Sequence, residues 1–112
     1  MPDPDLRKDQ LAGVLEMLVL RTLTLGPAHG YAIARHIERL SEDVLKVEQG
    51  SLYPALDRLL RRGWVRAKWK KTPTGREARY YTITAAGRKR LDERVEAHAR
   101  VMLAVQRVMD NA

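Results

Sequence analysis

The chain has 112 residues, of which 45% are hydrophobic and 31% charged, and this size and composition predict one small folded domain and exclude a disordered tail or a membrane protein. Its 21 Lys and Arg residues outnumber its 14 Asp and Glu residues, so the net charge of +7 points to a polyanionic partner, most simply nucleic acid. The absence of cysteine excludes disulfides and thiolate metal sites, and the acidic, proline-containing start does not resemble a signal peptide, so we expect a cytoplasmic protein.

Two helices are predicted in the first 40 residues. Residues 11–25 are apolar on almost every side and include only two charged residues, which predicts a buried central helix. At 15 residues this segment is too short to cross a bilayer, which takes about 20, and Gly26 and Pro27 end the helix. Residues 31–40 place their isoleucines on one face and their charges elsewhere, which predicts a short amphipathic second helix.

A third helix is predicted over residues 49–62, where four leucines recur at helical spacing. Pro54 is tolerated only in a first helical turn, so we expect the helix to begin near Gly50 or Ser51. The leucines take the buried face, which leaves six residues facing outward: Ser51, Tyr53, Pro54, Asp57, Arg58 and Arg61.

From residue 64 onward the spacing of apolar residues changes from that of a helix to that of β-strands. Residues 64–70 alternate apolar and basic side chains and residues 79–84 are β-branched and aromatic, which predicts a hairpin whose tip, residues 71–78, is positively charged. We call this hairpin, residues 64–84, the wing. Its two tryptophans, Trp64 and Trp69, are interpreted as packing in the core or across the hairpin. Residues 58–90 hold 12 basic residues against one acid, a local net charge of +11, while the rest of the chain is mildly acidic.

A long last helix is predicted from Ala85 to about Met109, with Thr84 as its N-cap. Apolar or weakly polar residues recur along it at spacings of 4, 3, 4, 3 and 4, forming a seam of Leu91, Val95, His98, Met102, Val105 and Met109. This helix, about 37 Å long, is too apolar along the seam to stand alone in water. We expect it to pair in a two-fold homodimer; the alternative is that it folds back on its own domain.

The predicted fold class is therefore mainly α with a small β-hairpin, a winged helix-turn-helix followed by a dimerisation helix. The expected organisation is an N-terminal arm at residues 1–10, a DNA-binding domain at 11–84 and a dimerisation helix at 85–112. The first turn of the third helix offers Gln49, Ser51 and Tyr53 as polar groups for base edges or phosphates; packing against the second helix is the alternative for Tyr53. No catalytic or metal-binding motif is present, so no enzyme activity and no cofactor are expected.

Three segments also resemble the PadR family of bacterial transcriptional regulators: GPAHGYAI at 26–33, EQGSLYPALDRLLRRGWV at 48–65 and RYYTITAAGRKRL at 79–91. The resemblance covers roughly residues 11–91 and implies a short, dimeric winged-helix repressor. It implies DNA contacts by Ser51, Tyr53 and Pro54 and by the wing. It also implies that a small molecule can relieve repression, held in some relatives between tryptophans of the last helix. Residues 85–112 contain no aromatic residue, so that arrangement is not expected here and an effector is left open.

Together these observations predict sequence-specific binding of double-stranded operator DNA by a homodimer. The helix near 50–62 is expected in the major groove, and residues 70–79 of the wing on the backbone or in the minor groove. The predicted DNA contacts are Gln49, Ser51, Tyr53, Pro54, Arg58, Arg61, Lys70, Lys71, Arg76 and Arg79. The predicted dimer contacts are the six seam residues. The alternative is a basic RNA-binding or protein–protein interaction module that uses the winged helix without sequence-specific DNA binding.

Overall fold

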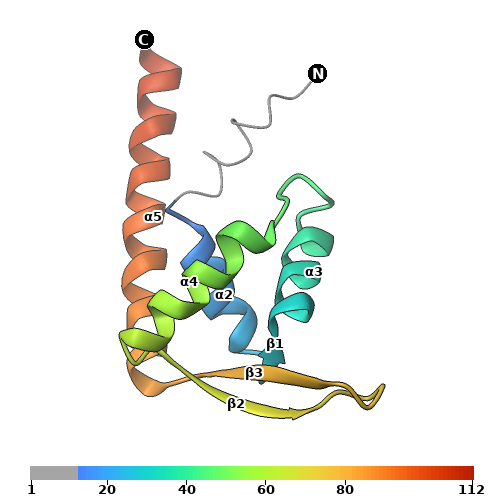
Figure 1. Cartoon of the computed structure of the whole chain (residues 1–112). Helices are drawn as coiled ribbons and strands as arrows, with labels where there is room; N and C mark the ends of the chain where they lie inside the picture. The colour runs from blue at the N-terminus through green and yellow to red at the C-terminus, as the bar shows by residue number, and fades with distance from the viewer. Residues whose placement is uncertain (1–12) are drawn as a thin grey trace.

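The computed structural model describes residues 13–112, so the predicted arm and the first residues of the predicted first helix lie outside the described residues. The elements follow in the order α2 (Leu15–Leu23), β1 (Ala28–His29), α3 (Gly30–Leu40), α4 (Gln49–Arg61), β2 (Val65–Lys71), β3 (Glu77–Ile83) and α5 (Ala85–Asn111), as Figure 1 shows. This order is that of a winged helix-turn-helix with a long terminal helix, so the predicted fold class is confirmed.

The core forms around α2, which contacts α3, α4, β3 and α5. Helices repeat about every 3.6 residues and strands every two, and each repeat places apolar side chains on one face of its element. These apolar faces pack against one another in a single cluster. The buried side chains of this cluster are Leu15, Val19, Leu20, Leu23, Ile33, Ile37, Val47, Leu52, Ala55, Leu56, Leu59, Val65, Tyr81, Ile83 and Leu91. The prediction of a central, buried first helix is therefore correct for its middle part.

The ends of α2 differ from the prediction of residues 11–25. Gly13 has a φ of +84° and precedes the helix, which begins at Leu15. At the other end the amides of Leu25 and Gly26 donate to carbonyls three residues back, which closes the helix at Leu23. Leu25 is consequently 75% exposed and does not belong to the core.

Helix α4 begins earlier than expected, and the prediction that Pro54 lies in its first turn is wrong. The carbonyl of Glu48 accepts from the amides of both Ser51 and Leu52, at 3.0 and 2.9 Å, so the helix starts at Gln49. Pro54 therefore lies inside the helix, and the carbonyl of Gly50 receives no bond from position 54. Both residues are exposed, so water can satisfy that carbonyl.

The wing is confirmed as an antiparallel hairpin, paired from Val65↔Ile83 to Lys71↔Glu77. β2 is shifted by one residue from the predicted strand and β3 begins two residues earlier than predicted, which shortens the tip to residues 72–76. The sheet has a third strand that the sequence did not indicate: β1 pairs with β3, giving the order β1-β3-β2. A two-residue strand shows no period, so only the pairing with β3 identifies it.

Helix α5 starts on the core and then leaves it. The hydroxyl of Thr84 accepts from the amide of Gly87 at 3.0 Å and donates to the carbonyl of Gly63 at 2.7 Å, so the predicted N-cap is confirmed. Beyond Leu91 the apolar side chains of the helix are exposed, and its C-terminal half extends past the rest of the described chain in Figure 1. The alternative that α5 folds back on its own domain is therefore wrong for this half. Among residues 13–112, no helix is long and apolar enough to span a membrane.

Candidate nucleic-acid interface

The predicted contacts on α4 separate into two groups. Gln49 and Pro54 are exposed, Ser51 is half-buried and Tyr53 is 47% exposed, so the first turns of the helix present polar groups to solvent. Arg58 instead donates from Nε to Oε1 of Glu16 on α2, at 3.1 Å.

The last predicted contact on α4, Arg61, forms an ion pair with Asp57 on the same helix, four residues earlier. The structure thus brings together the N-terminal contacts and directs the two arginines to acidic neighbours.

Tyr53 both packs and stays accessible. A Cβ atom on Gly30, the first residue of α3, would lie only 3.0 Å from Cε1 and from the hydroxyl of Tyr53. The ring therefore rests on the backbone of α3, and the absence of a side chain at Gly30 permits this approach. The alternative of packing against the second helix is therefore present in the structure, and 47% of the Tyr53 side chain stays exposed, so its contact with DNA remains a prediction.

A groove separates the wing from the N-terminal parts of α3 and α4. It is lined chiefly by Tyr31, Tyr53, Trp69, Arg76, Arg79 and Tyr81, and we call it the wing groove. Two of these residues, Arg76 and Arg79, are predicted DNA contacts from the wing. Trp69 is 64% exposed, so the interpretation that it packs in the core is wrong.

The predicted wing contacts do not all lie on one side of the sheet. Trp69 pairs with Arg79 and Lys71 with Glu77, and successive residues of a strand face opposite ways, so these positions share the side of the wing groove. Lys70 lies on the other side, with its Nζ 4.3 Å from the centre of the Tyr80 ring.

The other tryptophan, Trp64, packs against the core as predicted. It is half-buried against the core, with the guanidinium carbons of Arg62 and Arg90 at 5.2 and 4.9 Å from its ring centre. These two arginines are among the basic residues of 58–90, so part of that charge lies on an aromatic ring at the start of the wing.

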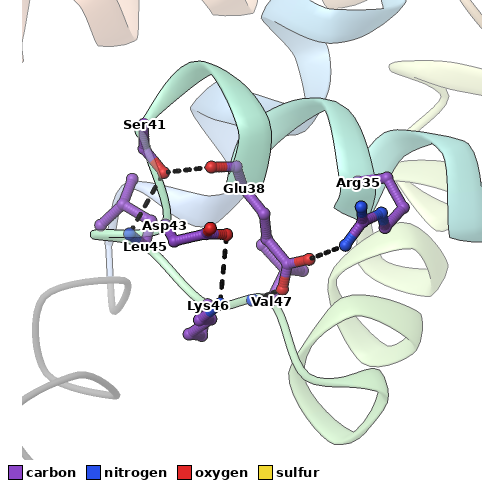
Figure 2. A network of polar contacts seen from close by, with 7 residues as sticks. All are labelled: Arg35, Glu38, Ser41, Asp43, Leu45, Lys46 and Val47. Atoms are coloured by element: carbon purple, nitrogen blue, oxygen red, sulfur yellow. Dashed lines mark hydrogen bonds and ion pairs between the residues drawn. The ribbon is translucent and has the colours of Figure 1, made fainter.

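The connection from α3 to α4 is held by a polar network that Figure 2 shows. Oε2 of Glu38 accepts from the amide of Val47 at 3.0 Å, and its Oε1 lies 3.7 Å from Nη1 of Arg35. The hydroxyl of Ser41 donates to the carbonyl of Glu38 and accepts from the amide of Leu45. Val47 is buried two residues before α4, so this bond ties α3 to the segment that leads into α4.

The same connection closes α3 with two backbone bonds. The amide of Asp43 donates to the carbonyl of Glu38, and the amide of Glu42 to that of Arg39. Glu42 and Asp43 have φ of +51° and +62°. This is the Schellman arrangement, in which glycine usually occupies the first left-handed position.

Four of the six predicted dimer contacts form an exposed stripe. Val95, Met102, Val105 and Met109 are 46–73% exposed and His98 is half-buried. Leu91 is buried in the core of its own chain. A second groove lies where α5 leaves the core, lined by Met17 and Leu18 of α2 and by Leu91 and Val95 of α5, among others.

Two further features of the described residues bear on function. Within residues 13–112, no group of three or more His, Cys, Asp or Glu side chains is arranged to hold a metal ion. No side-chain nitrogen or oxygen in this part of the chain is buried without a hydrogen-bond partner.

Comparison with known proteins gives a consistent result. The family described as "Transcriptional regulator PadR-like family" matches residues 19–93. The fold is similar to that of a transcriptional regulator from Clostridium thermocellum, with a TM-score of 0.81 and 22% identity over 88% of this chain and 96% of that one. A PadR-like transcriptional regulator from Bacillus cereus has a TM-score of 0.77 and 25% identity, covering 93% of this chain and 99% of its own. A PadR family transcriptional regulator from Eggerthella lenta is 31% identical, with a TM-score of 0.72 and coverage of 96% and 88%.

Proposed function

Because this chain belongs to the PadR-like family of transcriptional regulators, we propose that it binds operator DNA as a homodimer and represses transcription. The family is one of regulators and not of enzymes, in agreement with the prediction of no catalytic activity. One observation carries the proposal: the first turns of α4 present Gln49, Ser51 and Tyr53 beside a groove that holds Arg76 and Arg79.

In the proposed complex, the N-terminal part of α4 lies in the major groove. Gln49 and Ser51 then hydrogen-bond to base edges or phosphates, and the positive end of the helix dipole adds attraction for the phosphates. Pro54 and the exposed part of Tyr53 make van der Waals contacts with the duplex at the same surface in this proposal. Arg58 and Arg61 are paired with Glu16 and Asp57, so in this proposal each exchanges its carboxylate partner for a phosphate when the duplex binds.

The wing supplies phosphate contacts in this proposal. Arg76 and Arg79 face the duplex from the wing groove, and Lys71 extends the same side of the hairpin. Lys70 approaches the backbone from the opposite side of the sheet, which suits a hairpin placed along a minor groove. Contacts to phosphates position the protein and do not distinguish sequences.

The exposed stripe of α5 supports the homodimer of this proposal. Four of its apolar side chains, Val95, Met102, Val105 and Met109, have no partner within the described chain that would bury them. Two copies related by a two-fold axis would cover these stripes and would place two α4 helices for two half-sites about one turn of DNA apart.

We also propose that the boundary between the two functional parts lies at the start of α5. Residues 11–84 then bind DNA and residues 85–112 form the dimer. Gly87 and Leu91 are buried in the core of the first unit, so the first two turns of α5 also support the DNA-binding domain.

The experiment that tests the proposed function is selection of bound fragments from random or genomic duplex DNA. The expected result is a two-fold symmetric motif with half-site centres about 34 Å apart. Fragments without a shared motif, or preferential binding of RNA, would contradict the proposal and favour the alternative of a basic interaction module.

Salt dependence of binding to the selected duplex tests the wing. Each phosphate contact contributes about 0.9 to the slope of log K against log salt, so removing Arg76 and Arg79 from both protomers should lower the slope by roughly three to four. Arg100→Ala removes a positive charge from α5 outside the seam and serves as the control, with an unchanged slope. An unchanged slope in the Arg76→Ala, Arg79→Ala variant would remove these residues from the interface.

The dimer is tested by Met102→Glu. This change places a carboxylate in the middle of the apolar stripe on each chain, where burial without a cation is unfavourable. The variant should be monomeric in light scattering at concentrations where the wild type is dimeric, while far-UV circular dichroism stays unchanged. A dimeric variant would show that the interface lies elsewhere.

A further inference from the structure

Three exposed aromatic rings lie together in the wing groove. Tyr31 at the start of α3 is 68% exposed, Tyr53 on α4 is 47% exposed and Trp69 on β2 is 64% exposed. They come from three elements that are separated in sequence, so the fold and not a local motif gathers them. Aromatic side chains left open in this way are typical of surfaces that a partner covers.

Trp69 is open because of its place along β2. Val65 and Ala67 precede it on the same side of the strand and pack on the core, but the strand continues past the edge of the core. At position 69 the cross-strand neighbour is Arg79, and the ring faces the groove. Within residues 13–112, no further element covers it.

We propose that the wing groove holds one sugar–phosphate strand of the duplex, with Trp69 and Tyr31 packing against deoxyriboses. This inference rests on the proposed function and adds to it a contact surface outside α4 and the basic residues of the wing. Trp69 becomes a positioning residue for DNA, although the sequence indicated a packing role for it.

The chemistry of the groove matches such a strand. A nucleic-acid backbone alternates an apolar sugar with a charged phosphate, and the groove combines aromatic faces with the guanidinium groups of Arg76 and Arg79. Arginine forms bidentate bonds to phosphate oxygens, and the hydroxyl of tyrosine and the indole N–H of tryptophan donate to the same oxygens. One acid, Glu77, opposes these two cations among the groove's lining residues.

The position of the groove matches as well. Tyr53 lies both on α4 and in the lining of the groove, next to the turn that offers Gln49 and Ser51. In the proposed complex a duplex held by that turn passes the groove, because Tyr53 borders both surfaces.

Fluorescence of Trp69 tests this inference directly. The chain has two tryptophans, so Trp64→Phe leaves Trp69 as the sole emitter. Titration with the duplex found by selection should change its emission and reduce its quenching by acrylamide at least twofold. Trp69→Phe leaves Trp64 as the matched control, whose emission and quenching should stay unchanged. If Trp64→Phe does not fold, the difference between wild type and Trp69→Phe supplies the Trp69 signal.

Anisotropy of the labelled duplex is measured in the same samples, so the two proposals can fail separately. A duplex that binds while Trp69 stays equally open to acrylamide would overturn the groove inference and leave the proposed function intact. Failure of the wild type to bind any selected duplex would overturn both. Protection of Trp69 that follows protein concentration without DNA would show that a second copy of the chain covers the groove, and would also overturn the inference.

Affinity supplies a second measurement. Trp69→Ala should weaken binding of the selected duplex roughly tenfold, the size usual when a buried aromatic side chain is truncated at an interface. Trp69→Phe should weaken it less, because a smaller ring remains. Equal affinity of wild type and Trp69→Ala would overturn the inference.

Discussion

The carboxylate of Glu38 allows a prediction whose size follows from the structure. Its Oε2 accepts from the amide of Val47 at 3.0 Å, the side chain is 16% exposed and Val47 is buried. Glu38→Ala removes the acceptor and leaves that amide without a partner. A hydrogen bond to a charged group contributes about 1.5–3 kcal/mol net, so we expect the free energy of unfolding to fall by about 2 kcal/mol.

A neighbouring ion pair provides the matched control. Nζ of Lys46 lies 3.1 Å from Oδ1 of Asp43 in the same connection, but both side chains are well exposed, at 41% and 67%. Exposed pairs of this kind contribute at most about 1 kcal/mol, so Lys46→Ala should change stability only slightly. Glu38→Gln should lie between the two, because its amide oxygen can still accept from Val47.

Urea unfolding, followed by circular dichroism at one fixed protein concentration, measures these differences, since the stability of a dimer depends on concentration. Binding of the selected duplex is measured beside it. Because Glu38 holds the segment that leads into α4, we expect Glu38→Ala to weaken DNA binding even where the protein is fully folded. A loss of stability no larger than that of Lys46→Ala would refute the assignment of Glu38 as the residue that holds the α3–α4 connection.

Three further changes have expected outcomes. Gly87→Ala should destabilise the protein by at least about 2 kcal/mol, because the new Cβ would lie 2.0 Å from the carbonyl oxygen of Trp64; Gly50→Ala, where nothing lies within 4 Å, is the control and should be neutral or stabilising in the same urea experiment. Glu42→Gly should raise the free energy of unfolding by up to about 1 kcal/mol, and with it the urea midpoint, because residue 42 has a left-handed φ of +51° that glycine adopts without strain. A lowered midpoint would contradict the Schellman interpretation. Tyr53→Phe should leave the urea midpoint nearly unchanged and alter the ranking of selected sequences, whereas an identical ranking would exclude its hydroxyl from recognition.

Local signals in the sequence accounted for most of the fold. The leucine stripe of α4, the alternation along β2 and the N-cap at Thr84 each depend on residues a few positions apart, and each element appears where its period predicted it. The ends were less accurate, as at Leu25 and Pro54, because turns and caps depend on single hydrogen bonds that no period records. The two-residue strand β1 was missed for the same reason.

For the candidate site, too, some features could be predicted from the sequence and others could not. By itself the sequence determined that the positive charge is concentrated in residues 58–90 and that the first turn of α4 carries polar groups, because charge and helical phase are properties of the chain. Only the tertiary structure decided what each group faces. It pairs Arg58 with Glu16, 42 residues away, rests Tyr53 on Gly30 and leaves Trp69 open beside Arg79. A period specifies which face of an element a residue occupies, but the neighbour across that face is set by packing between distant segments.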